Sequence, residues 1–242
     1  MQVSFTRPVR HSGVVVSPYD ARSLPLVLTG SLSMPWSPAG VEERFDRLES
    51  LDAIRQLVAK YCLALDMRDL DALCGLFPED VRVSRGQTGR RALKRWFDQT
   101  LREQFTGTAH VTGNHIIEFE DRDHARGLVY SRNEHETGDE WIIMTMQYWD
   151  RYERVDGQWL FRRRLPLYWY ATDLNMPPVG ENKMRWPGRE PYEGGYAAFW
   201  PSWARFWSQD YEADCDVPAP AGLDEFLDRM APAEEALSVR VR

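Results

Sequence analysis

The residues with the clearest potential for chemistry lie in two short stretches, KYCLALDMRD at 60–69 and TAHVTGNHIIEF at 108–119. The first carries Asp66 and, five residues earlier, Tyr61; the second carries His110. A histidine that faces a cavity beside an aspartate can act as a general base, because the carboxylate holds one imidazole tautomer and stabilises the imidazolium. Asp66 and His110 are therefore the first candidates for proton abstraction from a small molecule.

Each of these residues also has a structural interpretation. A lone histidine in a strand is more often structural, and an aspartate at a helix end often accepts a bond from a backbone N–H. A tyrosine on an apolar helix stripe is usually part of the core. The run Arg162-Arg163-Arg164 is typical of a solvated face, although strand alternation directs at least one of the three to the inner side of a sheet.

The alternation of side chains along a strand argues against a metal site. It places His110 on one face of the strand at 108–119 and His115 on the other, so the two imidazoles could not share a metal ion. No other cluster has ligand spacing, and the sequence contains no P-loop, GxGxxG motif, nucleophile elbow or Cys/His pair. We therefore predict that the protein uses no metal and no organic cofactor.

Composition restricts the class of protein and its partners. The chain has 242 residues, of which 43% are hydrophobic and 28% charged, and its net charge is −7. This mixture is typical of a soluble globular protein. The lack of a basic block argues against a nucleic-acid partner, and no apolar run reaches the ~18–20 residues of a membrane span. Only three cysteines (Cys62, Cys74 and Cys215) and no secretory signal predict free thiols and a cytoplasmic location.

Three helices and a short strand are expected before residue 107. Apolar residues three and four apart predict a first helix with Ser50 as its N-cap, ending near Asp66. Asp69 caps a second, shorter helix that stops at Pro78. Alternating valines predict a strand at 81–84, and Gly89 opens the third helix.

After that the hydrophobic period changes to two. This predicts strands at 108–119, 125–135, 140–155 and 158–170. The pair Asp156-Gly157 predicts a tight hairpin between the last two strands. Helices followed by an antiparallel meander predict an α+β fold with the helices on one face of a curved sheet.

Two flanking segments differ from this patterned region. Residues 1–45 are rich in proline, and their apolar residues follow neither a helical period of 3.6 nor a strand period of 2. This predicts a loose N-terminal arm. Residues 175–242 form an aromatic-rich C-terminal extension that packs on the outside of the domain or on a second subunit; alternatively it folds over the pocket as a lid, hinged at Gly194-Gly195. Three of its tryptophans recur at helical spacing: Trp200, Trp203 and Trp207.

Residues 46–174 resemble the SnoaL-like branch of the nuclear transport factor 2-like superfamily. The resemblance rests on the motif D-x-x-A-I-x-x-L-x-x-x-Y…L-D-x-x-D-x-x-A-L-x-x-L-F, the strand motif H-x-x-x-N-x-x-I-E-F and the hairpin Y-x-R-x-D-G-x-W. It implies a cone-shaped α+β barrel, with a curved, mainly antiparallel sheet wrapped on the N-terminal helices around a deep apolar pocket. It also implies a homo-oligomer, either a dimer or a trimer.

The resemblance further implies roles for particular residues. The branch includes cofactor-free lyases similar to scytalone dehydratase, bile-acid 7α-dehydratase and hexachlorocyclohexane dehydrochlorinase, in which an Asp that ends the first helix pairs with a His on the central strand. Asp66 and His110 match this pair. Tyr61 resembles a tyrosine that polarises a leaving or carbonyl oxygen, and Arg164, with Arg163 as its rival, resembles an arginine that lines the pocket.

We therefore predict a cofactor-independent lyase of the dehydratase or elimination type that acts on a hydrophobic cyclic or aromatic small molecule. The alternatives are an isomerase or cyclase with the same base, and a non-catalytic subunit resembling the small subunit of ring-hydroxylating dioxygenases. The lyase requires His110 and Asp66 within hydrogen-bond reach in a closed apolar cavity, whereas the subunit requires a filled or open cone and an apolar outer sheet face. The residues expected to bind substrate are Asn114, Trp96, Tyr130, Met144 and Tyr148.

Overall fold

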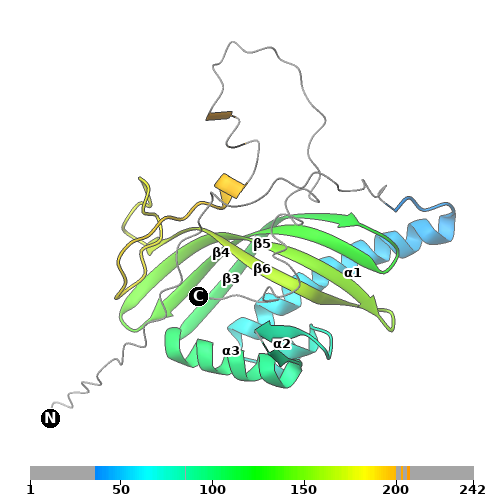
Figure 1. Ribbon diagram of the computed structural model, residues 1–242, viewed down its shortest axis with the longest axis horizontal. Coiled ribbons are helices and arrows are strands. Elements are labelled where there is room, and N and C mark those ends of the chain that lie inside the picture. The colour runs from blue at the N-terminus through cyan, green and yellow to red at the C-terminus, as the bar shows by residue number, and fades with distance from the viewer. Residues whose placement is uncertain (1–35, 85, 200–202, 204–205, 208–242) are drawn as a thin grey trace. The chain divides into compact units, whose positions relative to one another are not determined.

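The computed structural model describes residues 36–84, 86–199, 203, 206 and 207 (Figure 1). All the described residues belong to the second of two units of the chain, Met34–Arg242. The elements of the second unit are, in chain order, α1 (Val41–Asp66), α2 (Leu70–Gly75), β1 (Arg82–Ser84), β2 (Gln87–Thr88), α3 (Arg90–Gln104), β3 (Gly107–Phe119), β4 (His124–Thr137), β5 (Glu140–Val155), β6 (Gln158–Asp173) and the 3-10 helix η1 (Tyr196–Phe199).

The main sheet has four antiparallel strands in the order β3-β4-β5-β6. Their ends lie within three residues of the predicted ones. The turn between β5 and β6 has positive φ at Asp156 and Gly157, 51° and 80°, which is the backbone that an Asp-Gly hairpin predicts. The long strands curve over the helices (Figure 1), so the predicted α+β fold is confirmed.

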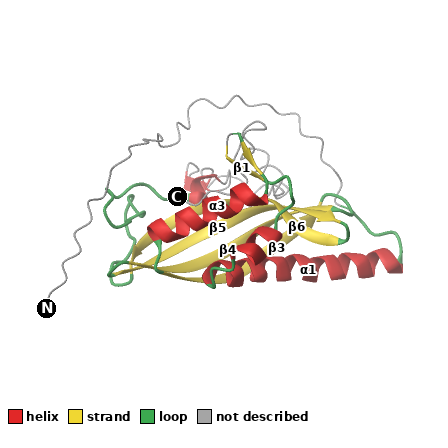
Figure 2. Ribbon diagram, turned by 90° about the horizontal axis from the view of Figure 1, so that it is seen from below, coloured by secondary structure: helices red, strands yellow, loops and turns green. Residues whose placement is uncertain are grey.

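The helices cover one face of this sheet. In Figure 1, α2 and α3 lie below the strands, and the view from below places α1 and α3 in front of them (Figure 2). The apolar side chains of the helices and of the inner sheet face form one buried cluster that includes Ile54, Phe97 and Phe161. A residue on the inner face of a strand can therefore contribute to a pocket between the sheet and the helices.

The first helix begins earlier than predicted. α1 starts at Val41 with Gly40 as its N-cap residue, so Ser50 is buried inside the helix and does not cap it. The prediction was wrong because it began the helix at the stripe from Leu51 onward and left out the apolar residues of the first turns, Val41, Phe45 and Leu48, which are exposed. Glu42 and Glu43 lie in the first turn, where carboxylates interact favourably with the helix dipole. The expected boundary of the N-terminal arm, at residue 45, consequently falls inside α1.

The other two predicted helix starts are confirmed. The Asp69 side chain accepts a hydrogen bond from the Ala72 N–H at 3.0 Å and so caps α2. Gly89 precedes α3 with a φ of 91°, a conformation that favours glycine. The Asp69 cap fixes the chain shortly after Asp66, and Gly89 fixes it directly before α3.

β3 contains a bulge that overturns the predicted alternation. Its register with β4 shifts between Thr112 and His115, and Gly113 and Asn114 have no partner in the ladder. The extra residue turns His115 toward the inner face, where it contacts buried Tyr152. His110 and His115 therefore lie on the same face of the strand, because a bulge reverses the side-chain alternation that follows it.

Part of the C-terminal extension continues the domain after β6. Met184 forms a parallel bridge with Ala171 and an antiparallel bridge with Tyr192. At Gly194, an added Cβ would lie 2.1 Å from the carbonyl oxygen of Trp169. Only glycine fits so close to the strand backbone, so the predicted hinge residue is a point of close packing.

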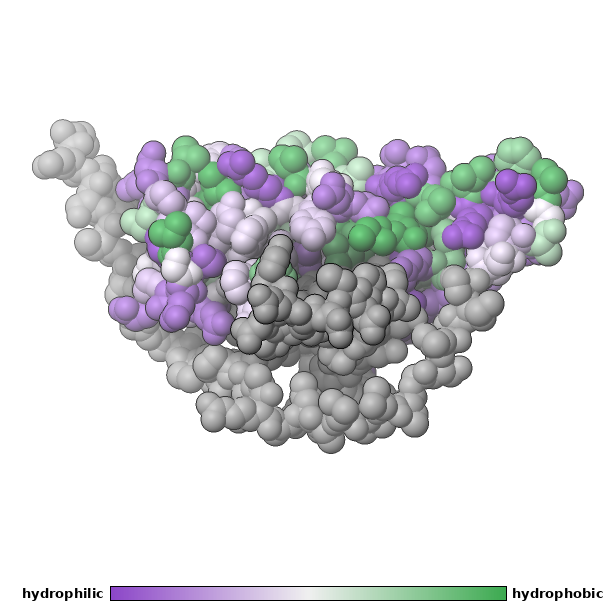
Figure 3. Space-filling view, turned by 90° about the horizontal axis from the view of Figure 1, so that it is seen from above, coloured by the Kyte–Doolittle hydropathy of each residue, from purple (hydrophilic) through white to green (hydrophobic). Residues whose placement is uncertain are grey.

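The outer face of the sheet carries a second apolar cluster. The cluster consists of Tyr196 and four strand residues: Leu128, Trp149, Leu165 and Leu167. Figure 3 shows the side of the molecule away from α2 and α3, where apolar side chains lie among polar ones. Val111, Ile116 and Tyr130 are exposed. The homo-oligomer stays a prediction.

The predicted aromatic helix face falls largely on residues outside the described part of the chain, including Trp200. Trp203 and Trp207 are described, are exposed, and have ring centroids 5.8 Å apart. The described start of this segment, at Tyr196, packs on the outer sheet face. That contact agrees with the packing interpretation for this part of the extension.

Two smaller features bear on the sequence analysis. Within the described residues, no helix combines the length and the apolar character needed to cross a membrane. Cys62 and Cys74 are buried free thiols, as predicted. Cys215 lies outside the described residues.

Candidate active site

Asp66 and His110 meet where α1 ends and β3 begins. The His110 Nδ1 lies 2.7 Å from Asp66 Oδ1, and the His110 backbone N–H donates to Asp66 Oδ2 at 2.8 Å. Both side chains are largely buried, with 5% of the histidine and 15% of the aspartate side chain exposed. Two contacts to one carboxylate fix the imidazole in position relative to α1.

The hydrogen bonds also determine which nitrogen of His110 is basic. Burial opposes ionisation of Asp66, but the bonds from the His110 ring, the His110 N–H and Thr108 hold the pKa of this carboxyl below its ordinary value. An ionised carboxylate can only accept hydrogen bonds. The proton of a neutral His110 therefore sits on Nδ1, and Nε2 is left with a free lone pair.

Thr108 and Arg68 stabilise the Asp66–His110 pair through hydrogen bonds. The Thr108 hydroxyl donates to Asp66 Oδ1 at 2.9 Å. Arg68, which follows α1 with a positive φ of 59°, donates from Nη1 to the Thr108 hydroxyl at 2.7 Å and to the Leu65 carbonyl at 2.9 Å. This chain of donors joins the end of α1 to the start of β3 and places the Thr108 hydroxyl proton on Asp66.

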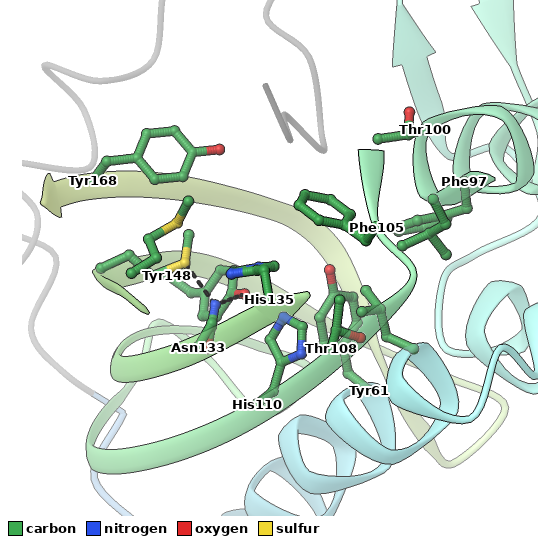
Figure 4. A pocket seen from close by; sticks show the side chains of 14 residues that line it. Tyr61, Phe97, Thr100, Phe105, Thr108, His110, Asn133, His135, Tyr148 and Tyr168 are labelled. Carbon is green, nitrogen blue, oxygen red and sulfur yellow. Dashed lines mark hydrogen bonds between the residues drawn. The ribbon is translucent and has the colours of Figure 1, made fainter. Parts of the chain in front are cut away.

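His110 lines a mostly apolar cavity between the sheet and the helices (Figure 4), whereas Asp66 is not among the lining residues. The cavity has about 30 Å³ available to the centres of water-sized molecules, where one water needs roughly 10–15 Å³. In this conformation it holds small groups, and a ring-sized ligand requires its walls to move apart. The lining residues are Tyr61, Leu65, Phe97, Thr100, Leu101, Phe105, Thr108, His110, Asn133, His135, Met144, Met146, Tyr148 and Tyr168.

Two tyrosines provide hydroxyl groups to this cavity. Tyr61 comes from α1 and has no hydrogen-bond partner among the described residues, while Tyr148 accepts a bond from Asn133 Nδ2 at 3.1 Å. Burial raises the pKa of both hydroxyls well above the usual range, against the opposing charge of Arg164. Both groups therefore stay protonated and can donate a hydrogen bond to a ligand.

Arg164 lies behind these tyrosines, outside the cavity lining. Its side chain is fully buried and bonds both carboxylate oxygens of Asp150, from Nε and Nη2, at 3.0 Å each. Its guanidinium carbon lies 4.3 Å from the ring centroid of Tyr61 and 4.0 Å from that of Tyr148. The expectation that Arg164 lines the pocket is thus corrected, because the cross-strand carboxylate Asp150 binds its charge.

The structure places the five expected substrate-binding residues in different environments. Met144 and Tyr148 line the cavity. Asn114 is an exposed residue of the β3 bulge, since the extra residue reverses the alternation. Trp96 packs against the core beside Phe97, and Tyr130 faces Tyr196 on the outer face of the sheet. Asn114, Trp96 and Tyr130 therefore lie outside the lining.

Sequence reasoning missed two polar residues of β4 that line the cavity. Asn133 and His135 are the register partners of His110 and Thr108. The His135 ring lies 6.1 Å from that of His110, and its Nδ1 has no hydrogen-bond partner among the described residues. Burial, together with the charge of His110, lowers the pKa of His135 to about 3. His135 is therefore a neutral side chain beside the candidate base.

A curved antiparallel sheet with helices on one face and a pocket between them defines the α+β class to which nuclear transport factor 2-like domains belong. Within this class, residues 46–165 match the model of the SnoaL-like domain. The chain belongs to the SnoaL-like family, as its motifs predicted.

Several solved structures are similar to this chain. A scytalone dehydratase-like protein from Novosphingobium aromaticivorans is 30% identical over 61% of this chain and 99% of its own, with a TM-score of 0.49. A hexachlorocyclohexane dehydrochlorinase, LinA-type3, from Novosphingobium barchaimii is 23% identical over 56% of this chain and 99% of its own, with a TM-score of 0.50. No curated protein matches the sequence.

Proposed function

We propose that the protein is a cofactor-independent lyase that eliminates a small leaving group from a hydrophobic cyclic or aromatic molecule. The observation that carries this proposal is the 2.7 Å contact between His110 Nδ1 and Asp66 Oδ1 at the wall of the cavity. The contact leaves Nε2 free as a base in a largely apolar site. An imidazole whose other nitrogen is held by a carboxylate can act as a general base toward a bound ligand.

The reaction follows from the groups at the cavity. His110 Nε2 takes a proton from a substrate carbon, and the electrons of the broken C–H bond form a carbon–carbon double bond as the bond to the leaving group breaks. Asp66 stabilises the imidazolium that results. Tyr61 and Tyr148 donate hydrogen bonds to the oxygen or halide that gains charge. The proton on His110 then passes to the departing group or to solvent, which restores the base.

The lining indicates the substrate class. Most of the residues at the wall are apolar or aromatic, and no carboxylate, lysine or arginine is among the lining residues. A charged substrate would lose its hydration without gaining a partner there. A hydrophobic ring with one hydroxyl, carbonyl or halide matches the chemistry of this wall once the walls have moved apart, because a single polar group can meet Tyr61, Tyr148 or Asn133.

The similar proteins agree with an elimination. Two of them are named for reactions in which a small group leaves, a dehydratase and a dehydrochlorinase. Because one fold hosts several chemistries, the isomerase or cyclase and the non-catalytic subunit remain alternatives that an experiment must separate.

The experiment is a turnover screen of cyclic alcohols and halides followed by mass spectrometry. We expect a product that has lost water or hydrogen halide; an unchanged mass would indicate an isomerase or cyclase instead. His110→Ala should reduce turnover by about 10²–10⁴-fold, since a positioned base contributes that much. Asp66→Asn should cost less, but still about 10²-fold, because the amide favours the wrong tautomer.

The matched control is His124→Ala, which removes an exposed histidine from β4 outside the cavity lining. It should keep wild-type turnover. Wild-type turnover in a folded His110→Ala variant would exclude His110 as the base, and a folded protein with no turnover of any cyclic substrate would favour the non-catalytic subunit.

A further inference from the structure

A second cavity lies between α1 and the strands β3 and β4, and it shares no lining residue with the candidate active site. It has about 300 Å³ available to the centres of water-sized molecules, ample room for a small organic ligand. Its walls come from three elements: Arg55, Val58, Thr112, Gly113, His115 and Val129.

The β3 bulge builds one wall of this cavity. The register shift between Thr112 and His115 turns His115 inward and leaves Gly113 without a ladder partner at the cavity wall. Bulges commonly re-aim a side chain next to a functional site. A regular strand would have pointed His115 to the outer face, so the cavity and the bulge belong together.

A hydrogen-bond network holds His115 in this position. Tyr152 donates its hydroxyl proton to Asp150 Oδ2 at 2.8 Å, so its oxygen accepts from His115 Nε2 at 3.1 Å. Gly127 makes room for the ring of Tyr152, because a Cβ there would lie 2.9 Å from a ring carbon. Since Nε2 carries the proton of the neutral ring, Nδ1 is the atom that accepts a further proton.

The charge of the cavity is positive and unbalanced. The side chains of Arg55 and Thr112 have no ion pair or hydrogen bond to any described residue, and no carboxylate is among the lining residues. The floor is apolar because it consists of Val58 and Val129, which are almost fully buried at 3% and 0% exposed. A guanidinium above an apolar floor suits a ligand that has both a carboxylate and a short hydrocarbon part.

We propose that this second cavity binds a small organic carboxylate, whose charged group contacts Arg55 and Thr112 and whose apolar part packs on Val58 and Val129. The site is independent of the proposed elimination, because no residue of the candidate active site contributes to it. An inorganic anion fits less well, since it would leave the apolar floor uncovered.

Binding to this site is coupled to the protonation of His115. Burial, followed by the charges of Arg164 from β6 and Arg55 from α1, lowers the pKa of His115 to about 4; Tyr152 of β5 is its hydrogen-bond partner. A carboxylate beside the ring offsets the two positive charges and favours the imidazolium. The bound state therefore takes up protons more readily, and affinity should rise as the pH falls.

The test is a butyrate titration of the full chain with ¹³C-labelled histidine, followed by nuclear magnetic resonance at about pH 5 and about pH 7, so that the lower value approaches the His115 pKa of about 4 while butyrate, a carboxylate of ordinary pKa ~4.3, stays mostly ionised. We expect a saturable shift of the His115 resonance, with tighter binding at the lower pH and little change at His110. Arg55→Gln should weaken butyrate binding at least about tenfold, because a charge-assisted hydrogen bond is lost.

Two matched controls make the result decisive. Lys60→Gln removes another exposed cation from α1 and should leave butyrate binding unchanged, and n-butanol, which lacks the carboxylate, should bind at least about tenfold more weakly than butyrate. Equal butyrate affinity in the wild type and Arg55→Gln would overturn the proposal. So would equal affinity for butanol, or a butyrate shift confined to His110, which would place the ligand in the candidate active site.

Discussion

Arg164 shows how a single residue can serve a site that it does not touch. Its charge is bound by Asp150. Its guanidinium is surrounded by the rings of Tyr61, Tyr148 and Phe161. The Nη1 atom of this group has no hydrogen-bond partner among the described residues. A cation over a ring face is attracted by the ring quadrupole. Arg164 therefore positions the two tyrosines that face the cavity.

We expect Arg164→Met to lower the free energy of unfolding by about 3–5 kcal/mol, because it leaves the buried Asp150 carboxylate without its partner. Burial raises the pKa of Asp150 and Arg164 opposes that rise, so removal of Arg164 also favours the protonated acid. The double variant Asp150→Asn/Arg164→Met should recover at least half of the loss, as measured by urea unfolding. A single variant as stable as the wild type would contradict the buried pair.

At the scale of elements, periodicity predicted the segments well because the buried face of each strand and helix repeats in the sequence. It could not predict the pairing register, which depends on contacts between strands. The missed residue His135 becomes a site residue only because β3 and β4 pair Thr108 with His135. Arg164 likewise meets Asp150 through the register of β5 and β6.

The β3 bulge is a different kind of error, because the sequence contains a signal for it. Gly113 interrupts a strand pattern, and an isolated glycine inside a strand often marks a bulge. With that signal, His115 would have been expected on the inner face beside His110. Asn114, in turn, would have been placed on the exposed side, as the structure has it.

The C-terminal extension contributes an element that the family domain, residues 46–165, does not include. Its Trp186 packs with ring centroids 5.6 Å from His135 and 6.1 Å from Phe105, two residues that line the candidate active site. Trp186 thus supports the cavity wall from outside. The element that carries it is anchored to β6 by the bridge between Met184 and Ala171.

We predict that Trp186→Ala widens the cavity. Loss of this packing should lower stability by about 1–3 kcal/mol and raise the affinity for 1-naphthol relative to phenol by about tenfold, measured by thermal shift. Trp169→Ala is the control, since Trp169 packs on Tyr196 away from the cavity lining and should leave the affinity ratio unchanged. An unchanged ratio in Trp186→Ala would show that this wall does not limit ligand size.

At the scale of the whole molecule, two histidines on the inner sheet face, the buried His135 and the half-buried His115, couple folding to pH. Burial is the main cause that lowers the pKa of His135 to about 3 and that of His115 to about 4. In the unfolded chain both return to an ordinary value of ~6.5. The unfolded state therefore binds two protons, between about pH 6.5 and pH 4, that the folded state does not bind.

The two lowered pKa values contribute to the free energy of unfolding. This contribution is fully present above about pH 6.5 and is lost as the pH falls toward the folded pKa values, at about 1.4 kcal/mol per pH unit for each histidine. Between pH 7 and pH 5 the wild type should lose roughly 4 kcal/mol, a large part of a typical folding free energy. Urea unfolding at both pH values measures the loss. The double variant His115→Gln/His135→Gln should remove most of this pH dependence, whereas His124→Gln, at an exposed position, should retain it. If the double variant kept the wild-type dependence, the two histidines would not be the groups that protonate on unfolding, and other residues would have to supply the protons.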